Sequence, residues 1–155
     1  MSEAAARGLN ALEDLPETVR AALADYASDP ARADLILRVA CADSADPLPL
    51  YRVLYKFYNR QRRFEIARDY ATLALADAAQ RAGLPADCTT WTADRLSQTD
   101  PGLASQALLA IKAQAFLALR CARPEAARPL LAALARLDPS DGSGASVVQA
   151  LADGP

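Results

Sequence analysis

The segment over residues 50–67 constrains the fold more than any other part of the chain, because its bulky side chains follow a helical period. They recur at positions i, i+3, i+4 and i+7, which form one stripe along a helix. The stripe consists of Tyr51, Leu54, Tyr55 and Tyr58. Leu50, Val53 and Phe57 fill an adjoining stripe. Most of the circumference is therefore apolar, which predicts a helix over residues 47–61 that is covered on two sides.

A second helix, predicted over residues 63–82, offers mainly small side chains on one face. That face comprises Ala67, Tyr70, Ala71, Ala74 and Ala78. A polar turn near residues 59–63 separates the two helices, so the pair is expected to fold back as an antiparallel hairpin with closely spaced axes. A similar turn at residues 120–123 predicts a second hairpin, built from helices 101–121 and 124–137.

Composition extends the helical pattern to the rest of the chain. Roughly a quarter of the 155 residues are alanine and only six are glycine, which favours an all-α fold. Proline stands at several predicted helix starts, mostly after Asp or Ser, where its missing N–H leaves no hydrogen bond unmade. Further helices are predicted over residues 16–27, 30–42 and 145–152, with another over 3–13.

Residues 83–100 interrupt the pattern. Gly83 is predicted to cap the preceding helix at its C-terminus, and Thr92 to cap a short turn from Ala93 to Ser97. A connection of this length folds back on the domain or carries a function. Trp91, the only tryptophan, is interpreted as a plug of the core beneath this loop, with an anchor for a partner protein as the alternative.

The hairpins resemble the tetratricopeptide repeat (TPR) family, whose units of about 34 residues pair two helices with small and bulky residues at fixed sites. The matching sites are Tyr51, Leu54, Tyr58, Ala67 and Ala74 in the first unit, and Leu109, Ala113, Phe116, Ala127, Leu131, Leu134 and Asp138–Pro139 in the second. Tyr55, Ala71 and Lys112 depart from the family pattern, and the turn at residues 120–123 is expected to be one residue longer. The resemblance covers roughly residues 47–140.

This resemblance implies a right-handed stack of antiparallel helical hairpins, about seven helices in a single domain over residues 1–155. Its expected parts are an N-terminal hairpin (16–42), a first TPR-like hairpin (47–82), an inserted loop (83–100), a second TPR-like hairpin (101–140), and a short C-terminal helix with a tail (141–155). Ala67 and Ala127 occupy equivalent sites 60 residues apart, and the inserted loop explains the excess over one repeat period.

The net charge of −2 excludes a strongly basic protein that coats nucleic acid, but the charge is distributed unevenly. Residues 1–46 hold nine acids and four bases, whereas residues 47–82 hold seven bases and three acids. Either the two segments lie near each other or the basic segment faces an acidic partner, and both interpretations stay open.

Cys41, Cys88 and Cys121 are odd in number and widely spaced, so neither a disulfide framework nor a zinc site is expected. The N-terminus lacks the basic-then-apolar order of a signal peptide, and no apolar run is expected to approach a membrane span. We therefore expect a cytoplasmic protein that makes no contact with a membrane.

Catalytic chemistry finds little support. The chain has no histidine, which excludes imidazole general bases, His-ligated metals and Ser-His-Asp or Cys-His systems. No glycine-rich phosphate loop appears. Asp138 and Asp141 hint at a calcium loop without its flanking ligands, and Asp94 and Asp100 are better explained as local caps than as a catalytic pair. No enzymatic activity, metal or cofactor is expected.

Cations and aromatic residues interleave over residues 52–68, a pattern that also suits single-stranded nucleic acid. The cations are Arg52, Lys56, Arg60, Arg62, Arg63 and Arg68, and the aromatic residues among them are Tyr55, Phe57, Tyr58 and Phe64. Because the aromatic residues fit the buried stripe, nucleic acid is the less favoured partner.

The favoured function is protein–protein interaction, as an adaptor or chaperone-like assembly factor that clamps a partner helix or peptide in a groove. The predicted contact residues are Arg52, Lys56, Asn59, Arg63 and, on the equivalent helix, Lys112. They could instead serve only solubility, and a homodimer that covers an end helix is a further alternative. The segment from Leu84 to Trp91 also resembles small repeat proteins encoded among bacterial nitrogen-fixation genes, which implies an accessory factor for an enzyme complex such as nitrogenase.

Overall fold

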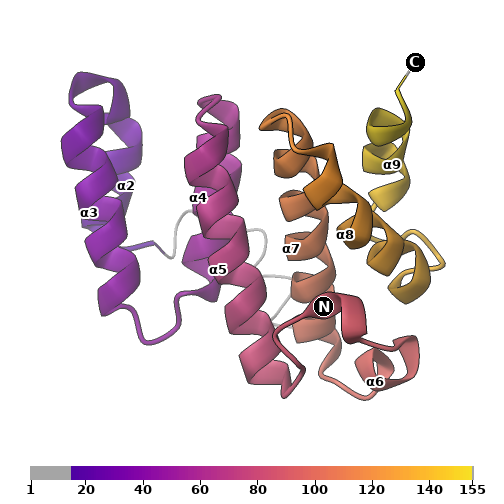
Figure 1. Cartoon of the computed structure of the whole chain (residues 1–155). Helices are drawn as coiled ribbons and strands as arrows, with labels where there is room; N and C mark the ends of the chain where they lie inside the picture. Colours follow the sequence, from indigo (N-terminus) through magenta and orange to yellow (C-terminus); the bar gives the residue numbers. More distant parts are fainter. Residues whose placement is uncertain (1–14, 155) are drawn as a thin grey trace. The chain divides into compact units, whose positions relative to one another are not determined.

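The computed structural model describes residues 15–154, and all of its regular secondary structure is helical (Figure 1). The helices are α2 (Glu17–Ala24), α3 (Pro30–Asp43), α4 (Leu48–Arg60), α5 (Phe64–Ala82), α6 (Ala93–Ser97), α7 (Pro101–Arg120), α8 (Pro124–Leu137) and α9 (Ala145–Asp153), with 3₁₀ turns η1 (Tyr26–Ser28) and η2 (Cys88–Thr90). No strand occurs between residues 15 and 154. The predicted all-α class is confirmed, while the helix predicted over 3–13 lies outside the described residues.

The chain divides into two compact units, one ending at Val53 and the other beginning at Leu54, so the boundary falls inside α4. In the first unit α2 packs against α3, and the fully buried side chains of Val19 and Leu37 contribute to its core. The hydroxyl of Tyr26 donates a hydrogen bond of 2.8 Å to Asp34. The single domain expected over residues 1–155 stays a prediction.

The helix starts follow the predicted capping chemistry. Pro30, Pro101 and Pro124 are each the first residue of a helix. The side chains of Asp29, Asp100 and Thr92 accept hydrogen bonds from backbone N–H groups in the first turns of α3, α7 and α6, at 3.2, 3.0 and 3.1 Å. At the other end of α5, Gly83 adopts φ 69°, the left-handed conformation that ends a helix.

The second unit is built on small side chains. In this unit α5 packs against α7, and α7 packs against α8. The buried residues of α5 include Ala67, Tyr70, Ala71, Ala74 and Ala78, as the small face predicted. In the preceding helix Leu54 and Tyr58 are fully buried, and the ring of Tyr58 stacks on that of Tyr70 with 5.6 Å between centroids and 14° between planes. The bulky stripe thus meets the alanine-rich helix at this ring pair.

The two hairpin turns have the same backbone conformation. Arg62 and Ala122 are left-handed, at φ 59° and 58°. The next residue donates to the carbonyl five positions back in both turns, Arg63 to Tyr58 at 2.9 Å and Arg123 to Ala118 at 2.8 Å. Both turns span three residues, 61–63 and 121–123, so the prediction that the second is one residue longer was wrong. Equivalent positions of the two turns, such as Arg62 and Ala122, are 60 residues apart, as are Ala67 and Ala127.

The left-handed residue of the second turn allows a test of this conformation. Replacing Ala122 with glycine is expected to stabilise the fold by about 0.5–1 kcal/mol, because glycine adopts positive φ without the Cβ clash. Replacing Ala132, an exposed residue within α8, is the matched control. The same change there should destabilise by about 0.5–1 kcal/mol. Urea unfolding of both variants measures the two effects, and equal signs would rule out the left-handed turn.

The inserted segment folds back onto the second unit, with η2 packed against α8 and α6 packed against α7 and α8. Trp91 is 1% exposed, and its indole N–H donates a 2.8 Å hydrogen bond to the carbonyl of Pro85. The guanidinium of Arg136 donates to the carbonyls of Thr89 and Trp91 at 3.0 and 2.8 Å. These contacts agree with the core-plug interpretation and leave the ring no surface for a partner in this conformation.

Among residues 15–154, α7 is the one helix that by length and composition could cross a membrane. The expectation that the chain makes no contact with a membrane stays a prediction. The same composition suits a core helix, because α7 packs against α5, α8 and α9 within its unit. Its buried residues include Ala110, Ile111 and Leu117.

Candidate functional site

The predicted contact residues are distributed over three places. Lys56 and Arg63 are exposed and Asn59 is half-buried, and together they follow the C-terminal half of α4 into its turn. Arg52 is half-buried and belongs to the first unit, on the other side of the boundary after Val53. Lys112 lies on α7 at a separate location.

The ammonium group of Lys112 is directed at the loop between α8 and α9. A Cβ built on Gly144 would lie 3.2 Å from its Nζ, so the lysine ammonium lies close to this glycine. Lys112 also helps to hold the pKa of Asp141 below its usual value, although hydrogen bonds from Ser146 are the larger cause. Lys112 therefore interacts with the loop between α8 and α9, next to Asp141 and Gly144.

Three of the acidic residues considered for metal binding or catalysis are occupied by local hydrogen bonds, whereas Asp94, predicted as a cap, lies within the first turn of α6, whose cap is Thr92. Asp138 accepts from the backbone of Gly142 and from both the backbone and the hydroxyl of Ser143. Asp141 accepts in the same double fashion from Ser146, and Asp100 caps α7. No cluster of three metal-ligating side chains occurs in the part of the chain that the structure describes.

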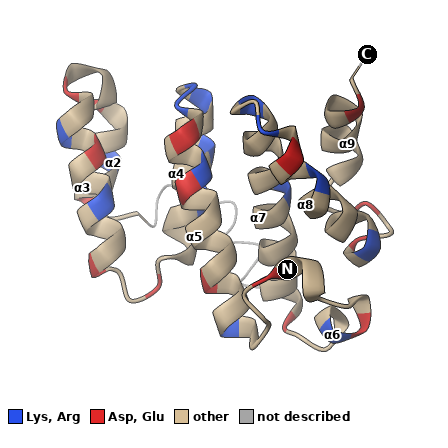
Figure 2. Cartoon of the chain, in the orientation of Figure 1, with Lys and Arg blue, Asp and Glu red and all other residues tan. Residues whose placement is uncertain are grey.

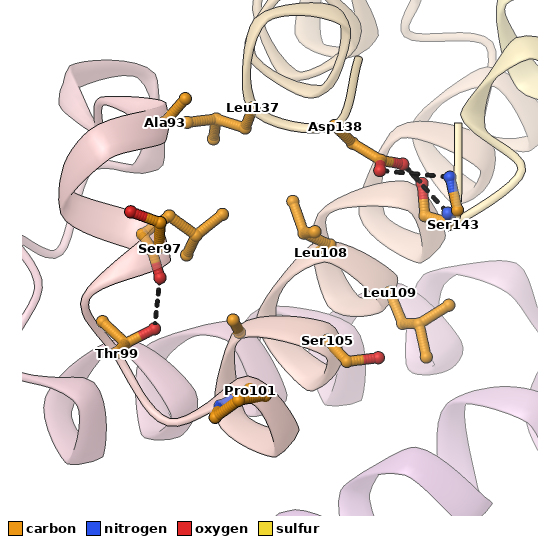
Figure 3. Close-up of a pocket in the computed structure, with 13 residues that line it drawn as sticks. Ala93, Ser97, Thr99, Pro101, Ser105, Leu108, Leu109, Leu137, Asp138 and Ser143 are labelled. Carbon is orange, nitrogen blue, oxygen red and sulfur yellow. Dashed lines mark hydrogen bonds between the residues drawn. The ribbon is translucent and has the colours of Figure 1, made fainter. Parts of the chain in front are cut away.

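An apolar cavity of about 500 Å³ lies between the inserted segment, α7 and the loop after α8 (Figure 3). Its walls include Leu96, Leu108 and Leu137, and its polar side chains include Ser97, Thr99, Ser105, Asp138 and Ser143. The carboxylate of Asp138 is directed toward Ser143, as Figure 3 shows, so the cavity offers little charge to a ligand. Its walls are mainly apolar, and its one carboxylate is already hydrogen-bonded.

A second cavity, of about 460 Å³, lies where the two hairpin turns of the second unit meet, and we call it the arginine cavity. Its lining comprises Arg62, Arg63, Phe64, Glu65, Ile66, Arg120 and Cys121. Figure 2 shows Lys and Arg colouring on both turns. The lining thus contains three guanidinium groups and one carboxylate.

Aromatic rings hold two of these arginines. The Cζ atoms of Arg62 and Arg120 each lie 5.6 Å from the ring centroid of Phe64, and Arg120 also lies 5.2 Å from that of Phe116. Such cation–π contacts contribute about 0.5–1 kcal/mol each at exposed sites. These contacts restrict the side chains of Arg62 and Arg120. The N–H groups at the edge of each guanidinium can still donate hydrogen bonds to an anion.

Burial raises the pKa of all three cysteine thiols. Burial raises the pKa of Cys41 to about 11, and burial is also the main cause that raises the pKa of Cys88. At the arginine cavity, burial and then the neighbouring carboxylate of Glu65 raise the pKa of Cys121. The pKa of each thiol is therefore shifted away from the thiolate form.

Arg120, which lines the arginine cavity, and Phe116, whose ring contacts Arg120, were absent from the predicted site. Sequence proximity grouped Arg62 and Phe64 with the other cations of residues 52–68, and the buried Tyr55 and Tyr58 of that group cannot stack on bases. One signal was present: the 60-residue offset of the equivalent alanines also relates Arg60 to Arg120 and Arg63 to Arg123. Comparison of this chain with protein-family models, with curated proteins and with solved structures finds no match.

Proposed function

We propose that this chain is a non-enzymatic protein-binding module, an adaptor or chaperone-like assembly factor that holds a partner peptide or helix against α4. The observation that carries the proposal is the division of that helix between core and surface. Leu54 and Tyr58 are fully buried and Tyr55 is 6% exposed, whereas Lys56 is exposed and Asn59 half-buried. The buried side of the helix thus leaves Lys56 and Asn59 on the side that a partner could reach.

The strip has the chemistry of a peptide clamp. Lys56 and Asn59 stand three residues apart on α4, a spacing that brings their side chains onto neighbouring positions of one helical face. Arg52 precedes Lys56 by four residues in the same helix, and Arg63 follows in the turn after it. Lysine and arginine bind carboxylates, and an asparagine amide binds backbone N–H and C=O groups at once. A partner held in this way needs no deep pocket.

A TPR-like stack of hairpins is proposed as the framework of this clamp. Its support is the identical conformation of the two turns and the single offset that relates them, which also relates Arg52 to Lys112. In such stacks the first helix of each hairpin lines a concave surface. The involvement of Lys112 with the loop after α8 makes it the weakest of the proposed contacts.

Self-association is the second candidate. Val147 and Leu151 of α9 are 66% and 56% exposed and stand four residues apart on one face. Burying such an apolar pair favours a contact with a second copy of the chain. A helix of nine residues offers less than the area of about 1,000 Å² that a stable dimer requires, so a partner of another kind is favoured.

Affinity capture from the native cell tests the function. The double charge reversal Arg52→Glu with Lys56→Glu is expected to reduce recovery of the captured partner at least tenfold, because it places two acids where the partner's acids would bind. Mass spectrometry of the recovered proteins, followed by titration with the purified partner, measures the effect.

The control for that experiment is Arg32→Glu with Arg38→Glu, two exposed arginines of α3 whose reversal changes the net charge equally. Equal recovery by the strip variant and the control variant would contradict the clamp. Recovery of this chain alone, with a mass in light scattering that doubles with concentration, would favour the dimer instead.

A further inference from the structure

We infer that the arginine cavity is the docking site for an acidic peptide segment of the partner, in which carboxylates flank an apolar side chain. The inference rests on the proposed function and adds the chemistry of the partner. It concerns a surface other than the α4 strip: the junction of the turns at residues 61–63 and 121–123, which share Arg63 alone with that strip.

The cavity is held together by contacts between its two turns. Arg120, the last residue of α7, places its guanidinium over the ring of Phe64, the first residue of α5. Arg123 forms an ion pair of 3.8 Å with Glu65 from the second turn to the start of α5. Because α5 packs along α7, the turns form one surface rather than two independent loops.

The positive charges of the lining favour a negatively charged ligand. Leaving Arg63 aside, the lining carries Arg62 and Arg120 against the single carboxylate of Glu65, and that carboxylate is paired with Arg123 outside the lining. Arg68 and Arg123 both lower the pKa of Cys121, against the larger effects of burial and Glu65, which places two further positive charges beside the cavity. An anion that enters therefore meets a surplus of guanidinium groups.

The aromatic contacts make this surplus suitable for carboxylates in particular. A guanidinium stacked on a ring loses less conformational entropy on binding, because the ring already restricts it. Its edge can then donate two parallel N–H bonds to one carboxylate. The apolar surfaces of Phe64 and Ile66, which line the same cavity, would contact an aliphatic side chain next to the acids.

Nucleic acid fits this surface less well than a peptide does. Affinity for nucleic acid depends on a row of cations that follows many phosphates. Here exposed acids interrupt the positive surface, with Asp69 one turn beyond Glu65 on α5 and Glu125 two residues after Arg123 on α8. The volume of about 460 Å³ matches a few side chains.

The test uses a fluorescein-labelled dodecapeptide in which paired glutamates flank leucines, and the same peptide with glutamine for glutamate. Fluorescence polarisation with the full chain should show binding of the acidic peptide that weakens with salt, and at least tenfold weaker binding of the glutamine peptide. The double variant Arg62→Gln with Arg120→Gln should bind the acidic peptide at least tenfold more weakly than the unmodified chain.

The matched control is Arg32→Gln with Arg38→Gln, which removes two exposed arginines from α3 and should leave the affinity within about twofold of the original. If circular dichroism shows that the cavity variant is unfolded, Arg62→Lys with Arg120→Lys replaces it. That pair keeps the charge but lacks the planar fork, and an affinity at least threefold lower is expected.

Three results would overturn the inference: equal affinity of the cavity variant and its control, equal binding of both peptides, or tighter binding of a single-stranded oligonucleotide of twelve nucleotides than of the acidic peptide. None of them touches the proposed function, which depends on partner capture through Arg52 and Lys56. Conversely, loss of the α4 clamp would leave peptide binding at the turns intact.

Discussion

Replacement of Trp91 by alanine is expected to lower the free energy of unfolding by about 3–5 kcal/mol, the usual cost of removing a large buried aromatic side chain. The indole is 1% exposed, so its loss leaves a cavity that the surrounding helices fill only in part. The hydrogen bond to the carbonyl of Pro85 is lost as well. Urea unfolding followed by circular dichroism measures the change, since the variant has no tryptophan fluorescence.

The matched variant is Trp91→Phe, which keeps most of the apolar volume and removes the N–H donor. Its expected cost is about 1–3 kcal/mol, because the Pro85 carbonyl then lacks its partner. A cost below about 1 kcal/mol for the alanine variant would mean that residues 83–100 contribute little to the core. Hydrogen exchange of α6 and η2, which pack against α8, locates the damage within the unit.

The second large effect concerns the ring pair that joins α4 to α5. Tyr58→Ala is expected to cost about 3–5 kcal/mol, because the side chain is fully buried and stacks on Tyr70. The same denaturant experiment measures it. An effect near zero would contradict the antiparallel pairing of the bulky and small faces, on which the whole hairpin interpretation depends.

A double-mutant cycle isolates the stacking from burial. Tyr58→Leu and Tyr70→Leu keep apolar volume, and their combination should show a coupling of about 0.5–1.5 kcal/mol. Tyr58→Leu combined with Leu134→Ala is the control cycle. Leu134 is also fully buried but lies on α8, so its effect should add to that of Tyr58 without coupling.

The predicted helices agree closely with the structure because the signals that place them are local. Proline at the first position of α3, α7 and α8, the cap of Asp100, and the left-handed Gly83 each act within a few residues. The alternation of Leu54 and Tyr58 with exposed Lys56 is equally local, since it follows from the helical period alone. Such features are determined before any helix meets another.

The length of the second turn was mispredicted because no local signal sets it. A turn that places a non-glycine residue at positive φ has no residue signature, because both Arg62 and Ala122 occupy that position here. The conformation depends instead on the two helices that the turn must join, whose spacing the small side chains set. The equal length of the two turns therefore became visible only in the folded hairpins.

The sequence by itself determined the helical class, the helix boundaries and the buried stripe of α4, because these depend on contacts between residues at most a few positions apart. Only the tertiary structure decided which charges gather. Arg62 and Arg120 share the ring of Phe64, and Arg136 holds the backbone of Trp91, through the packing of α5 on α7 and of η2 on α8. The contacts of Arg120 with Phe64 and of Arg136 with Trp91 join residues more than 40 positions apart, and no local period encodes which of many exposed arginines will meet.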